Sequence, residues 1–141
     1  SPKSLALTVS NLLRHVMLRM EREGPALVED NAELREVLAN IASYVSSLKS
    51  APESLRQLQA AFDAAAKPAP VNGYVSLLAL TEEAERLRTL LDTALKALQE
   101  HRKTLDAPDY KAVRNRIRAY LNNQIQRQSQ WIREAFTIER R

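Results

Sequence analysis

The apolar residues of this chain recur every three or four positions over long stretches, and this spacing places them on one face of an α-helix. Leucine and alanine supply most of them, with 21 and 20 copies among 141 residues. The chain has only 2 glycines and 5% aromatic residues, whereas sheets need turn glycines together with aromatic and β-branched residues. The sequence therefore predicts an all-α fold and disfavours all-β and α/β folds.

Five segments carry this pattern, separated by residues that end or cap helices. Gly24-Pro25 predicts the end of the first segment, because glycine often follows a helix end and proline cannot continue one. Asp30 followed by Glu33 has the spacing of a capping pair and predicts a new helix start. The expected helices cover residues 4–23, 31–49, 51–66, 81–103 and 108–137. Short connections favour an antiparallel bundle of four to five helices with a long C-terminal helix.

The chain length fits a single domain spanning residues 1–141. Pro68, Pro70 and Gly73 mark residues 67–80 as an internal linker whose second half is apolar. We expect residues 74–80 to pack against their own bundle, with docking on a partner as the alternative.

Several chemistries lack the residues that they need. There are no cysteines, which excludes disulfides, thiol nucleophiles and cysteine-ligated zinc. The only histidines, His15 and His101, lack the glutamate three positions before them that di-iron bundles use. The two glycines are isolated, so a glycine-rich phosphate-binding loop is absent. The sequence therefore predicts no metal, cofactor or catalytic residue, and favours a non-enzymatic protein.

Targeting signals are also absent from this sequence. No apolar run approaches the length of about 18 residues that a membrane-spanning helix needs. The stretch from Leu5 to Leu18 contains Asn11, Arg14 and His15 and is too polar for a signal peptide. We therefore expect a cytoplasmic protein that does not bind membranes.

The net charge of +4 is concentrated in the last quarter of the chain. Residues 108–141 hold 8 basic and 3 acidic residues, whereas residues 1–107 hold 13 and 14. Lys111, Arg114 and Arg118 share one helix face, so nucleic-acid binding through this basic face is an alternative function. The other interpretation is that these side chains pair with the acidic clusters at residues 29–36 and 82–85.

The same stretch holds a run of amide side chains between residues 122 and 130. Two of these amides fall between apolar positions and are expected to be partly buried, where an unpaired amide costs about 1–3 kcal/mol. Either the run is an amide-rich helix surface in contact with solvent, or a second copy of the helix supplies partners and fixes the register, as a buried asparagine does in a coiled coil. The predicted interface comprises Leu121, Gln124, Ile125, Gln128, Trp131 and Ile132.

Two further positions suggest a small-ligand or enzymatic bundle as a second alternative. Asn11, His15 and Arg19 form a row with four-residue spacing that is either a solvated face or the polar rim of a ligand cleft. His101 lies on the line of Leu98 and is either a helix-end histidine or a general base. The favoured function remains protein–protein interaction or scaffolding, as a homodimer or with another helical protein.

Overall fold

The computed structural model describes residues 2–67 and 76–139, and the side chains of residues 8–14, 23–67, 76–130 and 133. No strand occurs in this described part. Its helices are α1 (Pro2–Ser47), α2 (Glu53–Gln57), α3 (Gln59–Ala66), α4 (Leu77–Glu100) and α5 (Ala107–Glu139). The expected all-α antiparallel bundle with a long C-terminal helix is confirmed.

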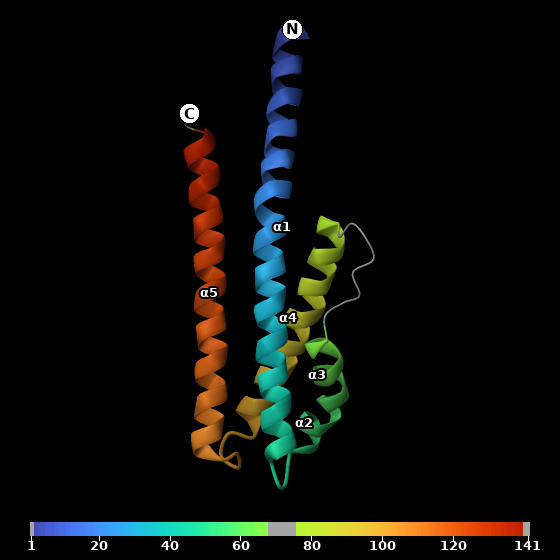
Figure 1. The fold of residues 1–141 in the computed structure, drawn as a ribbon, viewed down its shortest axis with the longest axis vertical. Helices are drawn as coiled ribbons and strands as arrows, with labels where there is room; N and C mark the ends of the chain where they lie inside the picture. Colours follow the sequence, from blue (N-terminus) through green and yellow to red (C-terminus); the bar gives the residue numbers. More distant parts are fainter. Residues whose placement is uncertain (1, 68–75, 140–141) are drawn as a thin grey trace.

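The arrangement centres on α1, which contacts α3, α4 and α5. In Figure 1, α1 and α4 run down the page, while α3 and α5 return in the opposite direction. The N-terminal half of α1 and the C-terminal end of α5 both extend beyond the N-terminal end of α4 (Figure 1). Both helices therefore project beyond the rest of the bundle, and α1 projects further than α5 (Figure 1).

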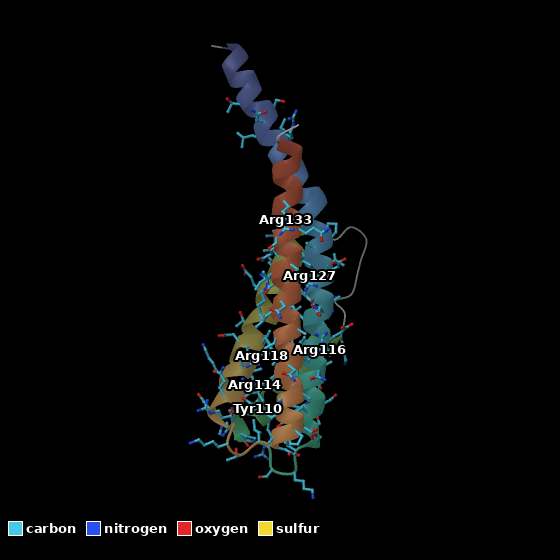
Figure 2. The ribbon with its side chains drawn as sticks, turned by 90° about the vertical axis from the view of Figure 1, so that its left-hand side faces the viewer. Tyr110, Arg114, Arg116, Arg118, Arg127 and Arg133 are labelled. Atoms are coloured by element: carbon cyan, nitrogen blue, oxygen red, sulfur yellow. The ribbon has the colours of Figure 1, made fainter. Side chains whose placement is uncertain are left out.

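The predicted helix break at Gly24-Pro25 is wrong, because α1 continues through Pro25 as one helix of 46 residues. Proline removes one backbone hydrogen bond and crowds the preceding turn, at a cost of about 3 kcal/mol. The apolar stripe has the same phase on both sides of this point, since Leu13, Met20, Leu27 and Leu34 are seven residues apart. Figure 2 shows α1 inclined in its N-terminal half, as expected for a helix that accommodates a proline.

Asp30 and Glu33 are therefore not capping residues, since both lie well inside α1. Their carboxylates face neighbouring helices instead. The capping signature was misleading because the same spacing of three places two side chains on one helix face.

Other helix boundaries also differ from the expectation. α4 begins at Leu77 and not at residue 81, because the Ser76 side chain accepts a hydrogen bond from the Ala79 backbone at 3.1 Å. It ends at Glu100, before residue 103. The helix expected over residues 51–66 is divided at Leu58.

The expected linker is correspondingly shorter. Residues 77–80 form the first turn of α4, and Leu80 in this turn is half-buried whereas Leu78 is exposed. Residues 68–75 lie outside the described part of the chain. The expected C-terminal helix over residues 108–137 agrees closely with α5.

The apolar core fills the end of the bundle opposite the chain termini, where all the helices meet (Figure 1). Each fully buried leucine or phenylalanine there contributes about 1.5–3 kcal/mol through removal from water. The largest fully buried apolar side chains are Tyr120, Phe62, Leu34, Leu38, Ile41, Leu55, Leu98 and Val37.

Polar residues interrupt this core toward the other end. The core positions of α1 alternate in steps of three and four, and after Leu34 the next buried residues toward the N-terminus are Asn31 and Asp30. The corresponding row of α5 runs through Ile117 and Tyr120 to Gln124 and Arg127. The helices therefore present polar side chains to one another at this level.

Candidate interaction site

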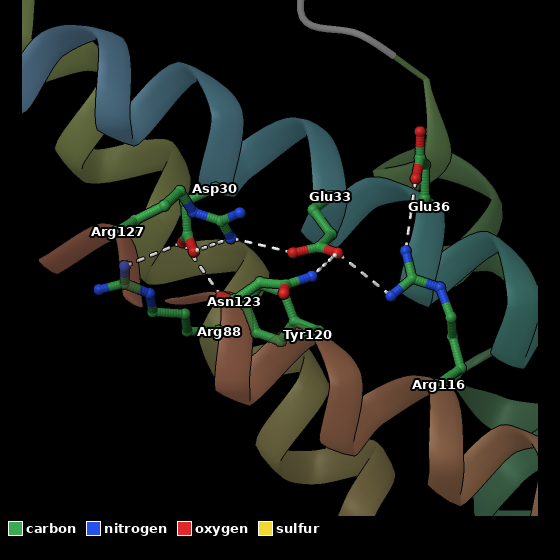
Figure 3. A network of polar contacts seen from close by, with 8 residues as sticks. All are labelled: Asp30, Glu33, Glu36, Arg88, Arg116, Tyr120, Asn123 and Arg127. Carbon is green, nitrogen blue, oxygen red and sulfur yellow. Dashed lines mark hydrogen bonds and ion pairs between the residues drawn. The ribbon is translucent and has the colours of Figure 1, made fainter. Parts of the chain in front are cut away.

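Asp30 is the centre of a polar cluster between α1, α4 and α5 (Figure 3). Only 4% of this residue is exposed. Its Oδ2 accepts hydrogen bonds from Arg88 Nη2 and from the Tyr120 hydroxyl, both at 3.0 Å. Its Oδ1 accepts one from Arg127 Nη2 at 3.0 Å. One carboxylate thus joins three helices, and the two guanidinium groups compensate its burial.

Glu33 extends the cluster by one turn of α1. Its carboxylate accepts hydrogen bonds from Asn123 at 2.9 Å, from Arg127 at 3.0 Å and from Arg116 at 3.3 Å. Arg116 also reaches Glu36 at 3.4 Å. Burial raises the pKa of Glu33, but the bonds from Asn123, Arg127 and Arg116 outweigh burial and hold this pKa below its ordinary value.

The hydroxyl of Tyr120 donates its proton in a hydrogen bond to Asp30. Burial raises the pKa of Tyr120, and the adjacent Asp30 carboxylate raises it further. The phenol therefore stays protonated throughout the physiological range and keeps its hydrogen bond.

A cavity of about 340 Å³ lies beside this cluster. Its size falls within the range of ligand pockets. Among the described residues that line it, neither Asn11 nor His101 occurs. The lining residues are Glu23, Ala26, Leu27, Asp30, Thr81, Ala84, Glu85, Arg88, Gln124, Arg127 and Gln128.

The predicted basic face lies outside the polar cluster. Lys111, Arg114 and Arg118 are all exposed, and within the described residues none of them has a carboxylate partner. The Arg114 guanidinium lies 5.8 Å from the centre of the Tyr110 ring. Figure 2 shows Arg116 on the α1 side of α5, and Arg114 and Arg118 on the other side.

The arginines of α5 therefore divide into two groups. Arg116 and Arg127 pair with acidic residues of α1, whereas among the described residues no such pair is made by Lys111, Arg114 or Arg118, for which this pairing was the other interpretation. The row of Lys111, Arg114 and Arg118 remains available at the surface.

The predicted interface residues are also divided by the structure. Leu121 and Ile125 are 41% and 60% exposed, and Gln128 is exposed beside them. Gln124 is half-buried and faces the cavity. The side chains of Trp131 and Ile132 lie outside the described part of the chain.

Most side chains of the polar row that was proposed as the rim of a ligand cleft lie outside the described residues. Asn11 is exposed, whereas the side chains of His15 and Arg19 lie outside the described residues. His101 is half-buried at the C-terminal end of α4, where its backbone N–H bonds to the Ala97 carbonyl. Its position matches the interpretation of a helix-end histidine.

A second uncovered apolar surface lies on the projecting half of α1. Val9, Leu12 and Leu13 are 49%, 60% and 59% exposed. Helical spacing places them on the same face as Leu34 and Ile41, which are fully buried further along α1. The core-facing stripe thus continues past the region where α4 covers it (Figure 1).

Sequence reasoning missed the polar cluster. The relevant signal was the alternation of three and four through Leu27, Asp30, Leu34 and Val37, which places Asp30 in a core position. A buried acid there requires basic partners, and Arg88 and Arg127 lie at core-edge positions of their own helices.

Among the described residues, no three histidine, aspartate or glutamate side chains gather in a way that could hold a metal ion. Within the same part of the chain, no helix has the length and apolar character to cross a membrane. Comparisons with models of protein families, with curated proteins and with solved structures found no match to this chain.

Proposed function

We propose that this chain is a helical interaction protein that self-associates through the outer face of α5. The observation that carries the proposal is the exposure of Leu121 and Ile125, two large aliphatic side chains one turn apart. The inner face of the same helix already packs against the bundle, since Val113, Ile117 and Tyr120 are buried there. A helix that is apolar on two faces is typical of a contact between subunits.

Analytical ultracentrifugation over a concentration series tests this function. We expect the wild-type chain to associate and Ile125→Glu to shift it to the monomer, because a charge at the contact must lose its water. Val28→Glu is the matched control, since Val28 is a 51% exposed aliphatic residue on α1. A wild-type chain that stays monomeric at high concentration contradicts the proposal, as does equal association of Ile125→Glu and the wild type.

Nucleic-acid binding is a second candidate, favoured by the exposed basic row of Lys111, Arg114 and Arg118. Such binding weakens steeply with salt, because each phosphate contact releases counterions. Filter binding of a DNA duplex at increasing salt measures this, with Arg114→Ala and Arg118→Ala combined as the test variant. Binding that is absent or insensitive to salt rejects this function.

A further inference from the structure

Two exposed rows of side chains, one on α5 and one on α4, have matching spacing. The α5 row consists of Lys111, Arg114, Arg118, Leu121 and Ile125, all exposed. Successive members are three, four, three and four residues apart, so the row is one straight face of the helix.

The α4 row has the same intervals in the reverse order. Its members are Leu78, Glu82, Glu85, Thr89 and Asp92, which are four, three, four and three residues apart and all exposed. Buried Ala84, Leu87 and Leu91 turn the opposite face of α4 to the core, so this row is directed away from it.

We propose that the α4 row of a second copy of this chain occupies the α5 row in antiparallel orientation. This inference rests on the proposed self-association and names its partner surface. With Ile125 opposite Leu78, the equal intervals place Arg118 opposite Glu85 and Lys111 opposite Asp92. Two aliphatic residues then meet at one end of the contact, and opposite charges meet at two positions further along it.

The two remaining pairs of residues are compatible with the antiparallel arrangement, and the parallel arrangement fits the two rows less well. In the antiparallel register, Arg114 faces Thr89 and Leu121 faces Glu82, so like charges do not meet. A parallel arrangement sets intervals of three against intervals of four. It also places Lys111 against Leu78 and Asp92 against Ile125, two contacts of a charge with an aliphatic side chain, whereas the antiparallel register has one, between Glu82 and Leu121.

The pairing is not available within one chain. Glu85 lines the cavity beside Gln124 and Gln128, and among the described residues no ion pair links the two rows. The one ion pair of the α4 row is local, between Asp92 and Lys96 at 3.0 Å. Both of these side chains are exposed, so this pair is weak and can be exchanged.

The geometry also sets the mode of assembly. Within one chain Arg88 of α4 and Arg127 of α5 meet at Asp30, nine residues beyond Arg118, so a second copy must shift along the bundle to bring its Glu85 to Arg118. Such a contact is head-to-tail and leaves one free row on each outer copy. Association therefore continues beyond a dimer as the concentration rises.

A charge exchange between two chains tests the partner surface. We expect Arg118→Glu and Glu85→Arg each to weaken self-association about tenfold, because each places like charges in contact. Mixing the two variants restores association, since each supplies the charge that the other lacks. Arg86→Glu is the control, because Arg86 is an exposed cation of α4 outside the row, and it leaves association within about twofold of the wild type.

The outcomes separate this inference from the proposed function. If Ile125→Glu abolishes association while Glu85→Arg leaves it unchanged, α5 self-associates through another partner surface and this inference is wrong. If the mixture associates no better than either variant alone, the pairing is also wrong. A monomeric chain that binds a DNA duplex through Arg118 overturns both proposals.

Discussion

The two ends of this bundle hold the same helices together by different means. Around Leu38, buried aliphatic and aromatic side chains from all the helices form a continuous core. Around Asp30, α1 is joined to α4 and α5 by a carboxylate and two guanidinium groups. Further toward the N-terminus, Leu12 and Leu13 occupy the same face of α1 and remain exposed. One helix thus passes from a dry core through a polar layer to an uncovered surface.

The comparison shows which interactions hold the helices together at each level of the bundle. Apolar burial needs neighbours on several sides, and only the end near the α4–α5 turn provides them. A polar layer depends on geometry, because each donor must meet its acceptor. We therefore expect the core to dominate the free energy of unfolding, and the polar layer to fix how α5 is aligned on α1.

The largest expected effect is the difference in the free energy of unfolding between alanine substitutions of two leucines of α1. Leu38→Ala should lower the free energy of unfolding by about 3 kcal/mol, because it leaves a cavity in the core. Leu12→Ala should change it by less than about 0.5 kcal/mol, because that side chain is exposed in one copy. Urea unfolding at low protein concentration measures both. If Leu38→Ala and Leu12→Ala lowered the free energy of unfolding equally, the two side chains would be equally buried, which would contradict the difference between the two ends of α1.

The next effect concerns the centre of the polar layer. Asp30→Asn should lower the free energy of unfolding by about 2–3 kcal/mol, because Arg88 and Arg127 lose the charge that compensates them. Glu36→Gln is the control and should cost less than about 0.5 kcal/mol, since Glu36 is largely exposed.

Replacing Asp30, Arg88 and Arg127 together tests whether their ion pairs stabilise the fold or mainly align α5 on α1. A variant with leucine at positions 30, 88 and 127 should recover stability to within about 1 kcal/mol of the wild type. Denaturant unfolding of this variant beside Asp30→Asn provides the measurement. A triple variant that is much less stable than Asp30→Asn would mean that the ion pairs themselves stabilise the fold.

A smaller effect follows from the lowered pKa of Glu33. The unfolded chain takes up a proton on this group near pH 4.5, while the folded chain does so at a lower pH. The contribution of Glu33 is therefore present above about pH 4.5 and is lost as the pH falls through the folded-state pKa. We expect a loss of less than about 1 kcal/mol, since the group lies near solvent.

Urea midpoints measured from about pH 6 to about pH 3 test this dependence. Glu33→Gln should flatten the decline, and Asn123→Ala should flatten it in part, because it removes one of the bonds that lower the pKa. If Glu33→Gln and the wild type declined in parallel, Glu33 would not be the group responsible.

The smallest effect tests the continuity of α1. A side chain at Gly24 meets no atom within 4 Å, so Gly24→Ala should raise the free energy of unfolding by about 0.5–1 kcal/mol through lower chain entropy. Circular dichroism during thermal unfolding reports the change. A destabilised Gly24→Ala variant would indicate that the helix ends at this residue, as the local sequence suggests.

The parts that followed from the sequence are those governed by local spacing. Apolar periodicity predicted α4 and α5 to within a few residues, and it predicted the region of α2 and α3 as one helix. The exposed basic row of α5 also followed from spacing. The polar cluster did not, because its bonds join residues that lie 58 to 97 positions apart.

The sequence by itself therefore determined that this protein is helical and which side of each helix is apolar, since both depend on neighbours within a turn or two. Only the tertiary structure decided that Gly24 and Pro25 lie within one helix of 46 residues, because the local cost of a proline does not by itself settle whether a helix ends there. The tertiary structure also decided that Asp30 is a buried link between helices. A carboxylate takes that role only where arginines from two other helices converge on it.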